Sequence, residues 1–171
     1  MADFRVFCVT ALHSERAGDG LAHTFVRVSC GDWVNVVPLT PAGEVVMIRQ
    51  FRHGLGAPTL EIPGGMVDEG EDPVQAATRE LLEETGYRPA RVEPLGSINP
   101  NPALFGNRLH TYLAHECECV AELDNDDHEE TVVELIPLRE IPDLLRRGQI
   151  DHALVMVAFS WLDLRGVKTD R

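Results

Sequence analysis

The sequence predicts an α+β fold in which a mixed β-sheet lies between α-helices. Strand-like runs fill the first third of the chain, one helix is indicated in the middle, and two helices close the chain. A length of 171 residues suits one domain that can bury a real core. Apolar residues make up 44% and charged residues 25%, which is the balance of a globular protein.

The strands of the first half are predicted by apolar or alternating runs that end at turn residues. A Gly-rich bend at Gly18-Asp19-Gly20 follows the first run, and Pro41-Ala42-Gly43 is typical of a hairpin turn. The expected strands of this half are, in chain order, residues 5–10, 22–29, 33–39, 44–51 and 59–62.

A helix is predicted over residues 73–85. Asp72 can cap its free backbone N–H groups, and Pro73 suits the first helical position. Gly86 suits the end of the helix. An apolar stripe is expected to face the core, and it consists of Val74, Ala77 and Leu81.

The second half is expected to hold three more strands and two closing helices. Gly148 separates the two helices, and the last one is rich in apolar residues but too short to span a bilayer. It is therefore expected to pack against the sheet. The expected strands are residues 91–98, 109–116 and 131–136, the helices are residues 139–147 and 151–165, and irregular loops lie at residues 99–102 and 124–130.

The sequence indicates a cytoplasmic protein without a membrane partner. No stretch reaches the roughly eighteen apolar residues of a membrane helix. The start, Met-Ala-Asp-Phe-Arg, lacks the pattern of a secretory signal. The four cysteines have the spacing of neither a disulfide framework nor a zinc site, and Cys117-x-Cys119 is expected to be a pair of buried thiols in a strand. A reducing compartment follows.

The net charge of −13 narrows the classes of partner. A nucleic-acid backbone needs a basic stripe, so no nucleic-acid partner is expected. A phosphate ligand is also an anion, so it would need a positive group between itself and the protein. A divalent cation held by acidic residues is the simplest such group.

Glu80, Glu83 and Glu84 share one face of the predicted helix. Like charges at this spacing destabilise a helix by a few tenths of a kcal/mol per pair. Residues 65–87 hold seven acidic residues and one basic residue, and a bound cation would offset their repulsion. A solvated acidic face is the alternative, but the preceding Gly64-Gly65 allows backbone to approach a ligand closely.

The same segment resembles the signature of the Nudix hydrolase family, Gly-x5-Glu-x7-Arg-Glu-U-x-Glu-Glu-x-Gly-U, where U is a bulky apolar residue. Every defined position is filled, by Gly65, Glu71, Arg79, Glu80, Leu81, Glu83, Glu84, Gly86 and Tyr87. The resemblance implies that Glu80, Glu83, Glu84 and the carbonyl of Gly64 ligate metal. It also implies an ion pair between Glu71 and Arg79 that braces the loop and the helix, with Arg79 and Glu83 among the catalytic residues.

The resemblance implies the Nudix fold with an N-terminal antiparallel strand extension. Residues 1–36 would form this strand region and pair two chains in a homodimer, and residues 37–171 would form the hydrolase domain. The implied cofactor is Mg²⁺, with Mn²⁺ as an alternative. The implied reaction is attack of water on one phosphorus of a diphosphate.

A general base outside the helix is also implied, in a late acidic loop. Here that loop is residues 124–130, and Glu129 or Glu130 is favoured, with Asp127 third. A merely flexible acidic turn is the alternative for each of these residues. His128 has a suitable ordinary pKa but is expected to be a surface residue.

The sequence before the signature resembles the ADP-ribose pyrophosphatase branch, on Arg49-Gln50-Phe51-Arg52 and on residues 60–65. Arg52 would bind phosphate, with a surface salt bridge as the alternative. Trp33 and Phe105 are candidates for stacking on a base, with a core role as the alternative. Arg27 is a further candidate for substrate contact.

One loop departs from the pattern of that branch. Residues 99–108 read Asn-Pro-Asn-Pro-Ala-Leu-Phe-Gly-Asn-Arg instead of the usual Ser-Pro-Gly form. The expected function is therefore hydrolysis of a nucleoside diphosphate sugar that resembles ADP-ribose. The alternatives are a Nudix hydrolase of another nucleotide, such as a dinucleoside polyphosphate or a modified nucleotide, and a regulator that binds nucleotide sugars without cleaving them.

Overall fold

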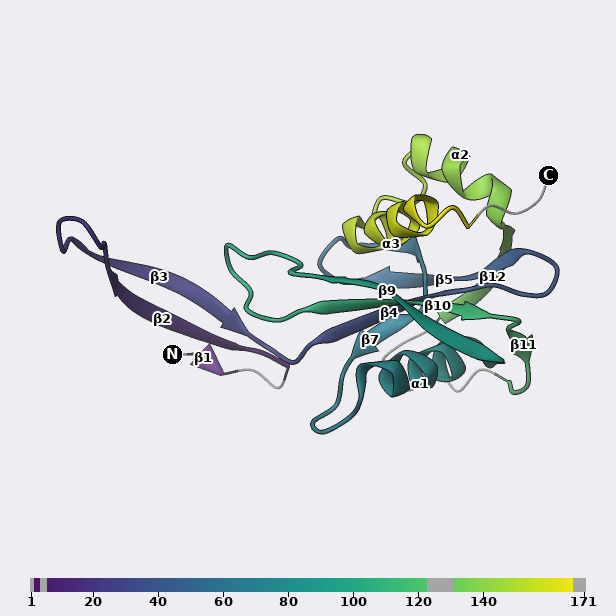
Figure 1. The fold of residues 1–171 in the computed structure, drawn as a ribbon, viewed down its shortest axis with the longest axis horizontal. Coiled ribbons are helices and arrows are strands. Elements are labelled where there is room, and N and C mark those ends of the chain that lie inside the picture. Colours follow the sequence, from purple (N-terminus) through teal and green to yellow (C-terminus); the bar gives the residue numbers. More distant parts are fainter. Residues whose placement is uncertain (1, 4–5, 123–130, 168–171) are drawn as a thin grey trace.

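The computed structural model describes residues 2–3, 6–122 and 131–167. The first half of this part consists mainly of strands and the end consists of helices, as predicted (Figure 1). The elements are β1 Ala2–Asp3, β2 Cys8–Glu15, β3 Ala22–Ser29, β4 Trp33–Pro38, β5 Glu44–Arg52, β6 Ala57–Glu61, β7 Gly64–Met66, α1 Pro73–Thr85, β8 Tyr87–Arg88, β9 Arg91–Ile98, β10 Leu109–His115, β11 Glu118–Cys119, β12 Thr131–Pro137, the 3₁₀ turn η1 Leu138–Glu140, α2 Ile141–Arg146 and α3 Ala153–Leu164.

The central sheet is mixed and has the strand order β7-β4-β10-β9. β4 and β10 are parallel, with Asn35 opposite Thr111, whereas β7 and β9 run antiparallel to their neighbours. A second, antiparallel sheet has the order β12-β5-β6. The sequence predicted the mixed character of the sheet but not its division in two.

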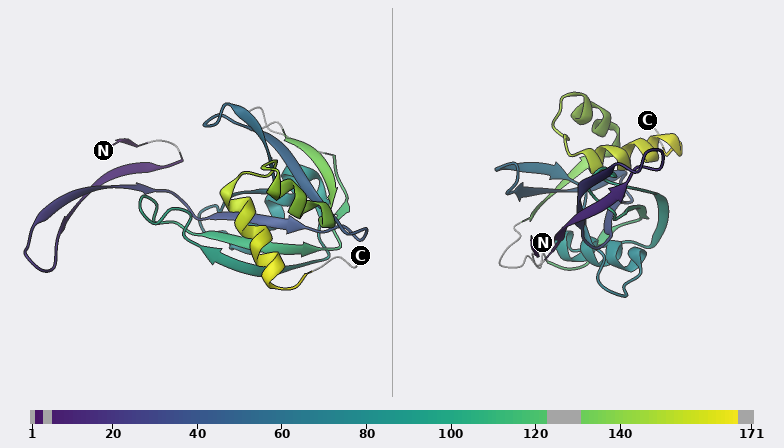
Figure 2. Two further views of the ribbon diagram at one scale, coloured as in Figure 1. Left: turned by 90° about the horizontal axis from the view of Figure 1, so that it is seen from above. Right: turned by 90° about the vertical axis from the view of Figure 1, so that its left-hand side faces the viewer.

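The helices cover opposite faces of the central sheet (Figures 1 and 2). Side chains of a strand alternate between its faces. In β4, Val34 and Val36 accordingly pack with Leu81 of α1, and Val37 packs with Phe159 of α3. The strand is buried on both sides, which explains its nearly continuous apolar sequence. The predicted sandwich of sheet between helices is confirmed.

Helix α1 has the predicted bounds and caps. The Asp72 carboxylate accepts a hydrogen bond from the backbone N–H of Val74 at 3.0 Å. Gly86 ends the helix with a left-handed φ of 73° and donates its N–H to the carbonyl of Leu82. Ala77 and Leu81 are fully buried, so the predicted stripe faces the core.

The N-terminal region forms a β-hairpin of β2 and β3 that projects from the body of the protein (Figure 1). The predicted first strand, residues 5–10, was placed too early, because the described strand runs from Cys8 to Glu15. Half of the residues of this strand are exposed and none is fully buried, so it lacks the alternation of buried and exposed positions that would have marked its end. The short strands β7, β8 and β11 were also not predicted.

The cysteines only partly follow the prediction. All four are free thiols, and Cys117 is buried with a pKa raised to about 12 by its burial. Cys119 is exposed, so its prediction as a buried thiol was wrong. The strand β11 begins only at Glu118, so Cys117 lies before it and packs with α1 independently of strand alternation.

Helix α3 packs across β4, β9 and β10, as predicted for the last helix. None of the helices in the described part of the chain is long and apolar enough to cross a membrane. On β9, Gly96 leaves room for the Trp161 ring of α3. A Cβ atom at Gly96 would lie 2.6 Å from that ring.

Replacement of Gly96 by Ala is expected to destabilise the fold by about 1–3 kcal/mol, because the Trp161 ring must leave its packed position. Thermal or urea unfolding measures this change. Gly106→Ala is the matched control, because a Cβ there meets nothing within 4 Å. Equal stability of the two variants would contradict the packing described for α3.

Candidate active site

A cavity of about 460 Å³ opens between the central sheet, the second sheet, α1 and the start of α3. It contains the glycines that precede α1 and two of the three predicted metal-ligating carboxylates. Its lining consists of Trp33, Val34, Asn35, Gln50, Arg52, Glu61, Ile62, Gly64, Gly65, Met66, Glu80, Glu84, Leu109, His152, Leu154 and Val155.

Gly64 and Gly65 both lie in close contact with neighbouring groups. Gly64 is opposite Asn35 in the antiparallel pair of β7 and β4. A Cβ at Gly64 would lie 2.4 Å from the carbonyl oxygen of Val34, and a Cβ at Gly65 would lie 2.3 Å from Oε1 of Glu80. The absence of both side chains therefore lets β7 lie between β4 and the carboxylates of α1.

The Arg79 guanidinium joins three carboxylates. It bonds both oxygens of Glu71, through Nε at 3.0 Å and Nη2 at 2.9 Å. Its Nη1 donates to Glu80 at 2.8 Å and to Glu83 at 3.1 Å, and Nη2 also reaches the carbonyl of Met66. The ion pair with Glu71 is the one that the family resemblance implied, and it ties the loop before α1 to the helix.

These contacts shift the pKa values of both partners. The hydrogen bond from Arg79 is the largest cause that lowers the pKa of Glu71. The hydrogen bond with Glu71, followed by those with Glu80 and Glu83, raises the pKa of Arg79 against the opposing effect of burial. Arg79 therefore stays positively charged at any pH that the fold tolerates, and partly offsets the repulsion between the carboxylates.

The three carboxylates of the predicted metal helix differ in their surroundings. Glu84 is buried, and its Oε2 accepts the backbone N–H of Gly64 at 2.9 Å. Glu80 is mostly buried, and both residues line the cavity. The Glu83 side chain is half exposed and borders the outer groove beside Arg79 instead of the cavity.

A divalent metal is implied by the family signature, and its fit can be judged from the donors. Within residues 2–3, 6–122 and 131–167, no three acidic, histidine or cysteine side chains are already gathered as a ligand set, since Arg79 binds both Glu80 and Glu83. The donor chemistry fits a hard cation, because all candidate ligands are oxygens. The space that a Cβ of Gly65 would fill lies against the Glu80 carboxylate.

Arg52 lies on the cavity wall and pairs with a buried acid, Glu61. Its Nε and Nη2 donate to the two carboxylate oxygens at 2.7 and 2.9 Å, and the Thr59 hydroxyl adds a bond of 2.6 Å. Burial would raise the pKa of Glu61, but these hydrogen bonds and the Arg52 charge outweigh it and lower the pKa. The ion pair that was considered for Arg52 is thus present, with a buried partner that faces the predicted site.

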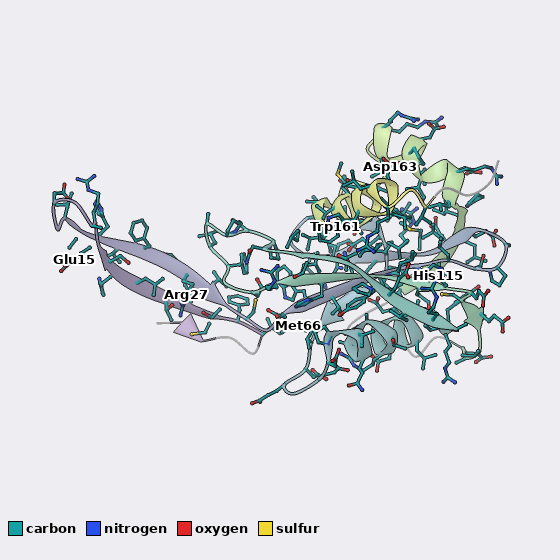
Figure 3. All side chains as sticks on the ribbon, viewed as in Figure 1. Glu15, Arg27, Met66, His115, Trp161 and Asp163 are labelled. Carbon is teal, nitrogen blue, oxygen red and sulfur yellow. The ribbon has the colours of Figure 1, made fainter. Side chains whose placement is uncertain are left out.

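The other predicted substrate residues are not all at the cavity. Trp33 lines it, and its ring lies 5.7 Å from that of Phe105, which is not among the lining residues. Figure 3 shows Arg27 on the projecting hairpin, away from Met66 at the cavity. The predicted base, Glu129 or Glu130, and the third candidate Asp127 lie outside the described residues.

Four polar lining residues were not assigned a role from the sequence. They are Asn35, Gln50, Glu61 and His152. Asn35 is buried, accepts the Thr111 hydroxyl at 2.6 Å and donates to the carbonyl of Leu154, so it fixes the start of α3 to β4. A polar residue inside the apolar run of β4 was the available signal, since buried polar groups need partners.

The site can be compared with known proteins. The model of the NUDIX domain matches residues 32–159. An ADP-ribose pyrophosphatase of Bacillus subtilis (strain 168) is 31% identical over 133 residues, which cover 77% of this chain and 72% of that protein. A methanol dehydrogenase activator of Bacillus methanolicus is 33% identical over 135 residues, with coverage of 77% and 72%.

A solved structure described as an ADP compounds hydrolase has the same fold. Its TM-score is 0.82, the match covers 97% of this chain and 91% of that chain, and the sequence identity is 24%. The structural match therefore includes nearly the whole of both chains.

Replacement of Glu61 by Gln is expected to lower the free energy of unfolding by about 1–2 kcal/mol at neutral pH, because the charged hydrogen bonds between the buried Glu61 carboxylate and Arg52 are weakened. The lowered pKa means that Glu61 stabilises the fold above its ordinary value of 4.5, and that this contribution is lost as the pH falls through the lower folded value. The difference from wild type should therefore shrink on acidification.

Urea unfolding at several pH values between about 7 and 3 measures this difference. Glu69→Gln, on an exposed residue, is the control and should match wild type throughout. A difference that stays constant with pH would rule out the charged pair as the source of the stability.

Proposed function

Because the chain belongs to the Nudix family of pyrophosphohydrolases, we propose that its substrate is a nucleoside diphosphate sugar resembling ADP-ribose. Hydrolysis of the diphosphate bond yields a nucleoside monophosphate and a sugar phosphate. The observation that carries the proposal is the position of Glu80 and Glu84 in one cavity with the Arg52–Glu61 pair and Trp33. Members of the family generally use divalent metal ions, and Mg²⁺ is proposed here, with Mn²⁺ as an alternative.

The proposed ligands of the metal are Glu80, Glu83, Glu84 and the carbonyl of Gly64. When bound, the cation supplies charge neutralisation at the diphosphate and a more acidic attacking water. Arg79 orients two of these carboxylates through its Nη1 group, and Glu84 is oriented by the backbone N–H of Gly64. The catalytic role of Arg79 is therefore to position ligands.

A general base is proposed in the acidic segment 124–130, on Glu129 or Glu130 with Asp127 third. The reaction needs a proton acceptor for the attacking water, and the described carboxylates at the cavity are already engaged. Glu61 is held by Arg52 and Thr59, and Glu84 accepts the Gly64 N–H. A carboxylate from outside this set would be available for the proton.

The nucleotide-sugar substrate is supported by the chemistry of the cavity walls. Arg52 carries a guanidinium at the cavity, where a diphosphate would sit beside the metal ligands. Trp33 offers an aromatic face for a base, with its neighbour Phe105 supporting the ring. The relative from Bacillus subtilis is named for ADP-ribose.

A homodimer is proposed, in which residues 1–36 pair with a second chain and residues 37–171 form the hydrolase domain. The hairpin exposes apolar side chains that the body of the protein does not cover, with Phe25 55%, Val26 54% and Leu21 51% exposed. Arg27 lies on the same hairpin and would approach the site of the second chain. Four free cysteines agree with the proposed cytoplasmic location.

The test of the function is hydrolysis of a substrate panel with Mg²⁺. Wild type should release AMP from ADP-ribose or a related nucleotide sugar faster than from a dinucleoside polyphosphate or a modified nucleoside triphosphate. Glu84→Gln and Glu83→Gln should each lower kcat by about two orders of magnitude or more, because a charged metal ligand is lost.

The control is Glu69→Gln, which removes an exposed carboxylate from the same acidic segment and should keep wild-type kcat. Circular dichroism is used to check that each variant is folded. Nucleotide binding without turnover would favour a regulator, and unchanged kcat in Glu84→Gln would refute its role as a metal ligand.

The dimer is tested by Phe25→Asp, which should convert dimers to monomers in light scattering, because a charge enters the apolar face of the hairpin. Leu164→Asp is the control, since Leu164 is exposed at the end of α3. A wild-type monomer, or a Phe25→Asp dimer of undiminished stability, would contradict this assembly.

A further inference from the structure

Two polar atoms beside Glu61 are buried and have no hydrogen-bond partner among the described residues. They are Oε1 of Gln50 and Nδ1 of His152, and both residues line the cavity. Gln50 is only 5% exposed, so its amide oxygen lacks bulk water as a partner. Buried polar atoms without a partner are rare and costly, and a ligand that binds them offsets that cost.

The two side chains are neighbours of one carboxylate. Nε2 of His152 lies 4.0 Å from Oε2 of Glu61. Thr59 lies opposite Gln50 in the second sheet. The Thr59 hydroxyl contacts the backbone carbonyl of Gln50 and also Oε1 of Glu61. Gln50, Glu61 and His152 are named the Glu61 subsite below.

Among the described residues, the His152 side chain has Glu61 as its only charged neighbour. The residue precedes α3 as its N-cap, yet its side chain forms no capping hydrogen bond. The ring instead faces the cavity and Glu61. Because the His152 side chain does not cap α3 and faces the cavity, it is available to bind a ligand there.

The subsite lies at the end of the cavity away from Trp33. β4 pairs with β7 so that Trp33 is opposite Met66 and Asn35 is opposite Gly64. Asn35 then reaches the carbonyl of Leu154 at the start of α3. The cavity thus runs from the aromatic ring, past the glycines and carboxylates, to His152.

The chemistry of the subsite selects hydrogen-bond donors without negative charge. The Gln50 amide oxygen accepts hydrogen bonds, and Nδ1 of a neutral His152 also accepts when the ring proton is on Nε2, the nitrogen on the side of Glu61. An ionised phosphate has no proton to donate to these two acceptors. Neighbouring hydroxyl groups provide two donors side by side, as in the 2′,3′-diol of a ribose ring.

We propose that Gln50 and His152 bind the vicinal hydroxyl groups of a ribose ring of the substrate. The inference rests on the proposed function, and it makes these two residues determinants of specificity for that substrate. The ribose is either that of the nucleoside or the terminal one, and the shared chemistry is the diol. Within the part of the chain that the structure describes, neither Oε1 of Gln50 nor Nδ1 of His152 bonds a proposed metal ligand, so the subsite acts on binding and not on bond cleavage.

The test combines removal of a ligand hydroxyl with removal of a side chain. Calorimetry measures the Kd values of AMP and 2′-deoxy-AMP, and of ribose 5-phosphate and 2-deoxyribose 5-phosphate. Wild type should bind one of the two ribose ligands about tenfold more tightly than its deoxy form, as expected for a neutral hydrogen bond. In Gln50→Leu or His152→Phe this ratio should fall toward one.

Gln149→Leu is the matched control, because Gln149 is exposed and should keep the wild-type ratio. The pair of ligands that shows the ratio identifies which ribose occupies the subsite. A ratio near one for both pairs in wild type, or a ratio that both variants preserve, overturns the proposal. If a variant instead loses the discrimination between AMP and IMP, the subsite binds the base, and the proposal is overturned.

These readouts need no turnover, so the inference and the proposed function fail separately. If the enzyme cleaves ADP-ribose but both variants keep the wild-type ratio of Kd values for deoxyribose and ribose ligands, only the subsite assignment is refuted. If the protein cleaves no substrate of the panel, the proposed function is refuted, and the diol can no longer be assigned to a substrate. Gln50 and His152 lie on different elements, so a folding defect in one variant leaves the other to decide.

Discussion

The close approach of Gly64 and Gly65 to their neighbours is the constraint on which the site depends. β7 fits between β4 and α1 only because neither residue has a side chain, with the Val34 carbonyl on one side and the Glu80 carboxylate on the other. This contact brings the backbone N–H of Gly64 to Glu84. A Cβ at Gly64 would clash with the backbone of β4, and a Cβ at Gly65 would displace the Glu80 carboxylate.

This close packing concentrates negative charge, and Arg79 partly neutralises it. Its guanidinium binds Glu71, Glu80 and Glu83 at once, so the helix can fold before any cation is present. The planar fork suits this task better than a lysine ammonium, since it reaches several carboxylates in fixed directions.

How much could be predicted depended on whether a feature is local in the sequence. Asp72, Pro73 and Gly86 specify α1 through contacts within a few residues, so its bounds were predictable, and the resemblance to the Nudix signature implied the Glu71–Arg79 pair. The partner of Arg52 follows from the register of β5 and β6, which no local pattern reveals. The unpartnered atom of His152 arises where α3 meets the second sheet, a tertiary contact that composition cannot show. The bounds of β2 were missed, whereas β3 was predicted with its observed bounds although most of its residues are exposed.

The cavity also separates the chemistry of cleavage from the selection of the substrate. The metal-ligand candidates come from β7 and α1, a continuous segment whose spacing is set by one helix. The Arg52–Glu61 pair, Gln50 and His152 come from β5, β6 and the start of α3. Under the proposed roles, a substitution in the second group can change the fit of a sugar while leaving unaltered the elements that carry the metal ligands. Nucleotide-cleaving chemistry can thus be kept constant while the strands and the last helix vary to suit different substrates.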